Sequence, residues 1–207
     1  MMKLYDYPRS SACFRVRIAL HLKNIPFDLE PIDLLTNGQN APDYLALNPQ
    51  GVVPTLQDGE VLLSQSLAIL EYLEERHPET PLLPGDAKFR ARIRQLALIV
   101  GCETHPLQNL SVLRSLGERF DATEEAKRAW ARAAIERGLK AFSEVVERSG
   151  HGPYCHGQAP TLADVFLVPQ LFNARRFECE LSLFPRLMEI DERCMNLEAF
   201  QRAAPGE

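Results

Sequence analysis

The first eighty positions of the chain switch between the spacing of apolar residues that is typical of strands and the spacing that is typical of helices. Residues 3–7 and 27–33 alternate apolar with polar side chains, as half-buried strands do. Between them, Phe14, Ile18 and Leu22 recur every four residues and share one face of a helix. This order of strand, helix and strand predicts a βαβ unit.

A hairpin and two further helices are predicted to follow this unit. Asp58-Gly59 suits a two-residue turn that matches the twist of strands, and it separates apolar runs at 52–57 and 60–63. A short helix at 43–47 precedes the hairpin, and a longer helix at 64–77 follows it. The order of these elements is that of a thioredoxin-like α/β domain.

The second half of the chain has the periodicity of helices. Apolar residues repeat at helical spacing over 87–108 and 124–148, and residues 117–121 between them are predicted to be a charged connection. The capping-box residues Thr161–Asp164 open a third helix, and Pro185 begins the last helical segment. This half is therefore predicted to be all-helical.

The chain is predicted to contain two domains. Its 207 residues are 45% hydrophobic, which is enough for one or two buried cores. Residues 79–86 are rich in proline and indicate a linker. We therefore expect a thioredoxin-like domain at 1–78, the linker at 79–86 and an all-helical domain at 87–207.

Charge and hydropathy argue against two classes of partner. The formal net charge is −5 and the isoelectric point is about 5.6, so the chain has no global attraction for nucleic acid or for an anionic membrane surface. It contains no long apolar run, and residues 1–3 lead directly into a strand pattern rather than a signal peptide. A cytoplasmic protein without nucleic-acid or membrane partners is the expectation.

The cysteines indicate a reducing compartment. They are odd in number and widely scattered, which does not suit a disulfide framework. Their spacing also lacks the pattern of metal ligands, so no metal site is predicted. The five positions are Cys13, Cys102, Cys155, Cys179 and Cys194.

Two serines stand where the first helix is predicted to begin. A serine at this place is a preferred N-cap, because its oxygen accepts a bond from an unpaired backbone N–H group, and a cap alone would explain Ser10 or Ser11. The positive end of the helix dipole also stabilises an anion or a thiolate, and Arg9 adds positive charge. Arg15 and Arg17 either strengthen this potential or line a solvated helix face.

The stretch Arg9-Ser10-Ser11 followed by Arg15-Val16-Arg17-Ile18-Ala19-Leu20 resembles the signature of zeta-class glutathione transferases, the maleylacetoacetate isomerases. The usual signature has a cysteine directly after the two serines, whereas this chain has Ala12 there and Cys13 one position later. The resemblance extends over nearly the whole chain. It implies the glutathione transferase fold, glutathione as the cofactor, a homodimer and a site between the two domains.

The resemblance also implies which residues contact glutathione. Val53-Pro54 resembles the pair with a cis proline whose backbone binds the cysteinyl part, although the proline could also mark an edge strand. The polar stretch from His105 to Ser111 resembles a family motif, although it could also be a kinked helix with a solvated face. The implied contacts are Ser10, Ser11, Gln39, Val53, Pro54, Gln65, Ser66, His105, Gln108, Asn109 and Ser111.

The implied reaction is a glutathione-dependent cis–trans isomerisation of a maleyl diacid. Ser10, Ser11, Arg9 and Arg176 are the expected catalytic residues, with Arg176 facing a substrate carboxylate unless it only extends from an apolar helix to water. Maleylacetoacetate is the first expectation for the substrate, and maleylpyruvate is the alternative. A conjugating or dehalogenating transferase and a non-catalytic glutathione-binding module are the other readings.

Overall fold

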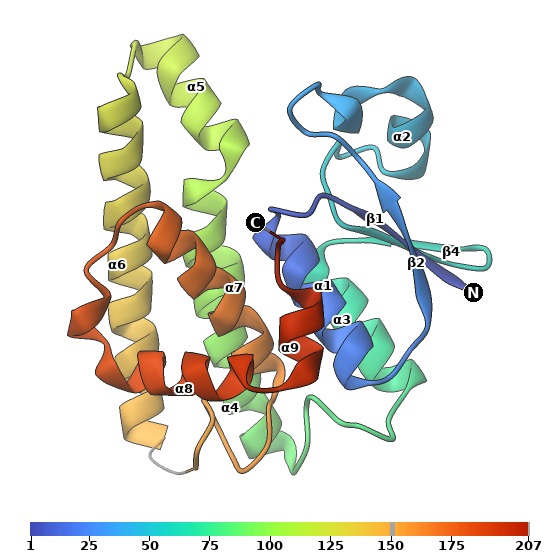
Figure 1. Cartoon of the computed structure of the whole chain (residues 1–207), viewed down its shortest axis with the longest axis vertical. Coiled ribbons are helices and arrows are strands. Elements are labelled where there is room, and N and C mark those ends of the chain that lie inside the picture. The colour runs from blue at the N-terminus through green and yellow to red at the C-terminus, as the bar shows by residue number, and fades with distance from the viewer. Residues whose placement is uncertain (150–151, 207) are drawn as a thin grey trace. The chain divides into compact units, whose positions relative to one another are not determined.

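The computed structural model describes residues 1–149 and 152–206, which form two compact units (Figure 1). Unit 1 consists of Met1–Leu82 and Asn196–Glu207, and unit 2 consists of Leu83–Met195. The described residues after Met195 therefore belong with the N-terminal unit, whereas they were expected in the helical domain.

Unit 1 is built on a four-stranded sheet. Its strands are β1 (Met2–Asp6), β2 (Phe27–Pro31), β3 (Thr55–Asp58) and β4 (Val61–Ser64), in the spatial order β2-β1-β3-β4. β1 and β2 are parallel, whereas β3 is antiparallel to both β1 and β4. This is the predicted thioredoxin-like arrangement, and it confirms the βαβ unit and the hairpin.

Two local expectations for the strands need correction. The two central residues of the hairpin turn are Gly59 and Glu60, because Asp58 pairs with Val61. Gly59 has φ = 60°, which suits glycine at the first central position of a type II′ turn. β2 was expected to be half-buried, but four of its five residues are exposed because it lies at an edge of the sheet.

The helices of unit 1 come from both ends of the chain. They are α1 (Ser11–Leu22), the short 3₁₀ turn η1 (Gly38–Asn40), α2 (Pro42–Leu47), α3 (Ser66–Arg76) and α9 (Glu198–Ala203). α1 packs against α3 and against α9, which comes from the far end of the chain (Figure 1). Of the ten buried residues of α1, two are arginines, so the helix is a central element rather than an amphipathic surface helix.

Arg15 and Arg17 do not line a solvated face. Arg17 forms a buried ion pair with Asp6, and it donates hydrogen bonds to the carbonyl oxygens of Pro8 at 2.9 Å and Ala203 at 2.8 Å. Arg15 is 2% exposed, and burial lowers its pKa to about 9 because the charged form is desolvated. Both arginine side chains are therefore buried within unit 1.

Among its described residues, unit 2 contains only helices and their connections. The elements are α4 (Ala87–Leu98), the π-helical segment η2 (Ile99–Thr104), the 3₁₀ segment η3 (His105–Gln108), α5 (Leu110–Phe120), α6 (Glu124–Ser149), α7 (Leu162–Arg176), η4 (Leu181–Leu183) and α8 (Pro185–Met195). α7 is buried along most of its length and packs against α4, α6 and α8. The predicted capping box is confirmed, since Thr161 and Asp164 bond each other's backbone N–H groups at its start.

The expected single helix over 87–108 is interrupted. It changes to π-helical winding at Ile99 and to a 3₁₀ turn at His105, just before Pro106, which has no N–H group to continue the α-helical ladder. The expected connection at 117–121 is wrong over most of its length, because α5 continues to Phe120. The last predicted helical segment is two helices, α8 in unit 2 and α9 in unit 1.

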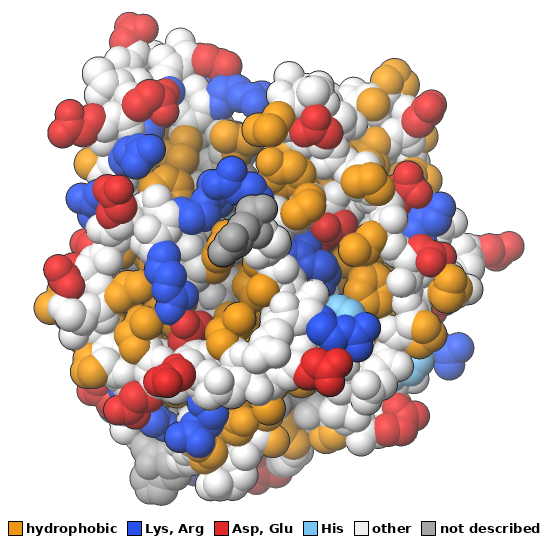
Figure 2. Space-filling model, viewed as in Figure 1, with side chains coloured by type: hydrophobic (Ala, Val, Ile, Leu, Met, Phe, Trp, Pro, Cys, Tyr) orange, Lys and Arg blue, Asp and Glu red, His pale blue; other side chains and the backbone are white. Residues whose placement is uncertain are grey.

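Acidic and basic side chains are interspersed over the face shown in Figure 2. Of the helices in the described part of the chain, none has the length and apolar composition that a bilayer crossing requires.

Candidate functional site

The start of α1 presents a serine as its N-cap and a second serine inside its first turn. The Ser10 hydroxyl oxygen accepts a bond from the Cys13 backbone N–H at 3.3 Å, so the capping role is real. Ser11 is the first helical residue and is 3% exposed. A hydroxyl that accepts one bond can still donate its own hydrogen. Ser10 can therefore cap the helix and donate to an anion at the same time.

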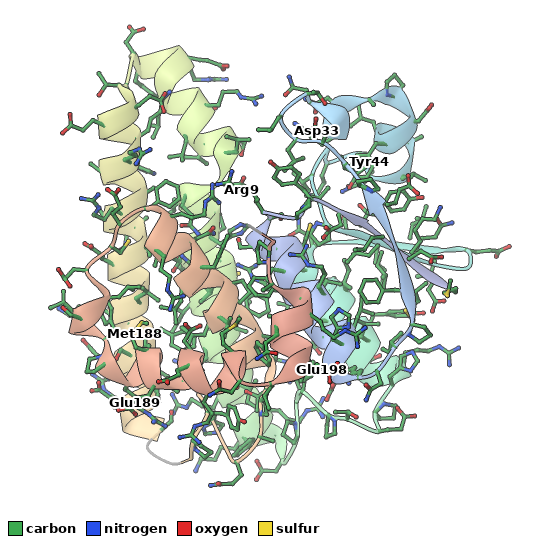
Figure 3. All side chains as sticks on the ribbon, in the orientation of Figure 1. Arg9, Asp33, Tyr44, Met188, Glu189 and Glu198 are labelled. Carbon is green, nitrogen blue, oxygen red and sulfur yellow. The ribbon has the colours of Figure 1, made fainter. Side chains whose placement is uncertain are left out.

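The turn that leads into α1 is held from two sides. The Ser10 backbone N–H donates to the Tyr7 carbonyl at 2.9 Å, and Arg17 donates to the carbonyl of Pro8. Arg9, which stands between Pro8 and Ser10, is exposed (Figure 3). The structure therefore leaves the Arg9 guanidinium at the surface of unit 1, beside a helix N-terminus that favours negative charge.

Cys13 lies in the core rather than at the surface of this helix start. It is fully buried and packs in a cluster with Tyr5, Tyr44 and Val53. Burial, as the main cause, and the neighbouring Asp6 carboxylate, as the second, raise the pKa of the Cys13 thiol to about 12. A thiol in this environment stays protonated at neutral pH, and only the thiolate is a good nucleophile.

The segment before β3 is fixed through the carbonyl of Val52. That oxygen accepts a bond from the Tyr44 hydroxyl at 2.6 Å and from the Asn48 side-chain amide at 2.7 Å. The Val53–Pro54 peptide bond that follows is cis, as the resemblance implies. Pro54 directly precedes a strand that lies between β1 and β4, so the edge-strand explanation for it is wrong.

Gln65 and Ser66 form the junction of β4 and α3. Gln65 has φ = 70°, a backbone conformation that is uncommon for a residue with a side chain, and it makes no side-chain cap bond to α3. Its amide instead donates to the Gln50 side-chain oxygen at 2.9 Å. The Ser66 hydroxyl oxygen accepts a bond from Arg15 at 3.2 Å. A plain cap therefore does not explain this pair of residues.

Gln50 is a candidate that the sequence analysis missed. Its side-chain oxygen also accepts a bond from the Ser64 hydroxyl at 3.3 Å, so it holds two consecutive residues at the end of β4. Gln50 follows Pro49 in a loop, and no periodic pattern marks it. Only its tertiary contacts identify it.

Gln39 lies on η1, a turn that is packed closely against Gly51. A Cβ atom added to Gly51 would lie 3.1 Å from the Asn40 side-chain oxygen and 3.2 Å from the Gln39 carbonyl. The Gln39 side-chain oxygen is buried and has no hydrogen-bond partner among the described residues. A buried polar atom of this kind commonly receives a bond from a water or a ligand.

Several of the predicted residues of unit 1 come together around α1. Cys13 of α1 packs in one cluster with Val53, and Arg15 of the same helix bonds Ser66 on α3. The helix start, the cis-proline segment and the start of α3 are thus connected through one helix. The sequence positions of these three segments are far apart, so only the fold brings them together.

In unit 2, the stretch from His105 to Ser111 is a 3₁₀ turn followed by the first residues of α5. Asn109 stands at the N-cap position of α5 with an extended backbone, although its side chain makes no cap hydrogen bond, and Ser111 is exposed. Gln108 differs from these residues, because it is 4% exposed and its amide donates to the Gln170 side-chain oxygen at 2.9 Å. His105 is half-buried.

Arg175 and Arg176 end α7 with different contacts. Arg175 forms an ion pair with Asp191 of α8 at 2.5 Å. Arg176 lies over the Phe172 ring and donates to the Asn173 side-chain oxygen at 3.4 Å. Both arginines are exposed, but the Arg175 guanidinium already has a carboxylate partner within unit 2.

The described residues contain no group of three or more histidine, cysteine, aspartate or glutamate side chains that could hold a metal ion.

Family models match both halves of the chain. The glutathione S-transferase N-terminal domain matches residues 4–81, and the glutathione S-transferase C-terminal domain matches residues 128–193. Together the two matches define the chain as a glutathione S-transferase with both of its domains.

Comparison with individual proteins shows which class of glutathione S-transferase the chain resembles. The chain is 47% identical to the maleylacetoacetate isomerase of Rhizobium meliloti (strain 1021), over 98% of this chain and 95% of that protein. It is 43% identical to the maleylpyruvate isomerase of a Ralstonia species, over 99% of this chain and 97% of that protein. The maleylacetoacetate isomerase of Anaeromyxobacter dehalogenans 2CP-1, solved with glutathione in its active site, is 48% identical, over 99% of this chain and 95% of that one, with a TM-score of 0.89. The chain belongs to the zeta-class glutathione transferase family, which includes these isomerases.

The environment of Cys13 predicts that it resists thiol reagents in the folded protein. With a pKa of about 12, about one Cys13 thiol in ten thousand is ionised at pH 8. Titration with a chromogenic disulfide, followed by peptide mass mapping, should label the exposed Cys102 first and leave Cys13 unmodified until the protein is denatured. Labelling of Cys13 as fast as Cys102 would contradict the buried assignment.

Proposed function

We propose that this protein is a glutathione-dependent cis–trans isomerase that converts a maleyl keto diacid, with maleylacetoacetate as the first candidate, to its fumaryl form. The observation that carries the proposal is the start of α1, where Ser10 and Ser11 stand at a helix N-terminus beside the exposed Arg9. Two relatives that match this chain over nearly their whole length are named as isomerases of such diacids.

The chemistry requires a thiolate. A carbon–carbon double bond rotates only when it becomes single for a moment. Addition of the glutathione thiolate to the cis alkene, which is conjugated with a ketone, forms a carbon–sulfur bond and moves the electron pair into an enolate. Rotation follows, and the returning electron pair expels the thiolate and forms the trans alkene. Glutathione is regenerated, so it acts as a cofactor.

Unit 1 is assigned the binding of glutathione. Hydrogen bonds from Ser10 and Ser11 to the charged sulfur would lower the pKa of the thiol, since donors to a charged form favour it. The backbone of Val53, before Pro54, would pair with the cysteinyl part. Gln65, Ser66 and Gln39 would hold the remaining polar groups of the peptide, and the unpartnered Gln39 oxygen supports this assignment.

Unit 2 is assigned the binding of the diacid. His105, Asn109 and Ser111 would supply contacts to glutathione and border the substrate. Arg176 would bind a substrate carboxylate, because a guanidinium matches a carboxylate with two parallel bonds. The pairing of Arg175 with Asp191 supports giving this role to Arg176 alone.

We also propose that the protein is a cytoplasmic homodimer. β4 is an edge strand, and Val61 and Leu62 on it are 41% and 40% exposed. An edge with apolar side chains is suited to pairing with a second copy. Sedimentation equilibrium would reveal the assembly, and a monomer at micromolar concentration would contradict it.

The function is tested by parallel kinetics on maleylacetoacetate and maleylpyruvate with glutathione present. We expect turnover of both diacids, with the larger kcat/KM for maleylacetoacetate, and no net loss of glutathione after many turnovers. A stoichiometric loss of free glutathione would instead identify a conjugating transferase. No isomerisation of either diacid would reject the proposal.

Replacing Ser10 and Ser11 together by alanine should raise the pKa of bound glutathione and lower kcat. The loss should be roughly tenfold to a hundredfold if one charge-assisted hydrogen bond of ~1.5–3 kcal/mol disappears. Ser10→Asp is the matched control for the helix cap, since its carboxylate still caps α1 but repels a thiolate. It should keep the melting temperature and still lose activity. Full activity in the double alanine variant would refute the assignment.

Arg176→Lys should weaken kcat/KM for the diacid by roughly tenfold, which is ~1.4 kcal/mol, because lysine cannot form the two parallel bonds. The affinity for glutathione and the melting temperature should change little. Arg175→Lys is the matched control on the neighbouring residue and should change kcat/KM for the diacid less. A larger effect of Arg175→Lys, or loss of glutathione binding in Arg176→Lys, would show that the carboxylate is bound elsewhere.

A further inference from the structure

Two glutamine side chains form a buried amide pair inside unit 2. The Gln108 amide nitrogen donates to the Gln170 side-chain oxygen at 2.9 Å, and the two residues are 4% and 0% exposed. The Gln108 oxygen and the Gln170 nitrogen are buried and have no hydrogen-bond partner among the described residues. Reversing both amides would exchange donor and acceptor but leave the same number of unpaired groups.

Such a pair adds little to the stability of the folded protein. One hydrogen bond is made, while two polar groups lose water without replacement, and an unpaired buried polar group is costly. Apolar side chains of similar shape at both positions would avoid this cost. The pair therefore needs another explanation than stabilisation of the helical core.

The position of the pair supplies that explanation. Gln108 is the last residue of η3, and Gln170 lies on α7, the helix that ends at Arg176. The hydrogen bond thus joins the two segments of unit 2 that carry the proposed binding residues. On the other side of η3, the Trp130 indole of α6 donates to the Leu107 carbonyl at 2.9 Å, so η3 is held between α6 and α7.

α6 also approaches the preceding segment closely. A Cβ atom added to Gly138 would lie 2.0 Å from the Thr104 hydroxyl oxygen, so α6 is in direct contact with the end of η2. η2 and Leu107 thus contact α6, and the Gln108–Gln170 bond joins η3 to α7.

We propose that Gln108 and Gln170 are positioning residues that align the His105–Ser111 segment with the end of α7, so that Arg176 and this segment meet one diacid molecule. This inference rests on the proposed function. It gives Gln108 an indirect role in place of a direct contact with glutathione. The polar pair is directional, because the bond forms at one register of η3 against α7, whereas apolar contacts would tolerate a shift.

The test compares Gln170→Met, Gln108→Met and the double variant with the unmodified protein. Methionine keeps the unbranched shape of glutamine without its polar groups. Each single variant should lower the Tm, by about 4 °C, because it leaves the partner amide unpaired. The double variant should recover the Tm, yet its kcat/KM for maleylacetoacetate should stay lower by roughly tenfold to a hundredfold. Gln95→Met, on the exposed surface of α4, is the control for the substitution itself.

A double-mutant cycle that combines Gln170→Met with Arg176→Lys separates an effect on the alignment of Arg176 from a general structural effect. If the pair acts through Arg176, the losses in kcat/KM caused by Gln170→Met and Arg176→Lys should not add, and the combined variant should be scarcely worse than the poorer single one. Losses that multiply, or a double methionine variant with unimpaired kcat/KM, would overturn the proposal. Gln170→Asn, whose amide is one methylene too short to reach Gln108, repeats the test if the methionine variants do not fold.

Trp130 gives a readout that does not depend on turnover. It is the only tryptophan in the sequence, and its indole is bonded to the residue next to Gln108. Its fluorescence emission should shift in the double methionine variant if η3 moves, and an unchanged spectrum would overturn the proposal. This signal does not depend on the substrate, so it tests the inference separately from the proposed function. If the proposed function is wrong, the unmodified protein itself will be inactive on the diacid.

Discussion

The guanidinium of Arg17 connects three segments of unit 1. It pairs with Asp6 at the end of β1, bonds the Pro8 carbonyl in the turn before α1, and bonds the Ala203 carbonyl of α9. A charge that is 5% exposed must have such partners, because its desolvation is costly when it is unpaired. The turn that carries Arg9 and precedes Ser10 is therefore held by a buried charge that has three hydrogen-bond partners. The proposed glutathione site depends on this arrangement.

The same helix creates opposite environments for two kinds of sulfur. At its N-terminus, serine hydroxyls and backbone N–H groups offer bonds to an anion, which favours a thiolate supplied by a ligand. One turn later, Cys13 is fully buried, and its pKa is raised to about 12. The resemblance to zeta-class enzymes leads one to expect a cysteine at position 12, where this chain has alanine. The geometry assigns no reactive role to the neighbouring thiol, so the proposed chemistry uses glutathione and the serines.

Two polar contacts of α7, one buried and one that involves an exposed arginine, join it to other segments of unit 2. The buried bond between Gln108 and Gln170 joins η3 to α7, and the ion pair of Arg175 with Asp191 joins α7 to α8. Both contacts restrain the helix that ends in Arg176. A helix end that must present one guanidinium to a small dianion benefits from such restraint, since small misplacements of a binding group reduce the rate strongly.

Periodicity and turn chemistry determined the strands, the hairpin, most helices and the fold class, because these depend on neighbouring residues and on which face is buried. Local chemistry also identified the capping box of α7 and the serine cap of α1. The continuation of α5 through Gly117 and the return of α9 to unit 1 were not predictable in this way, because packing against distant segments decides them. The same is true of Gln50, of the buried Arg15 and of the Gln108–Gln170 pair. A glutamine or an arginine looks the same in sequence whether water or a distant side chain satisfies it, and only the tertiary structure decides which partner it finds.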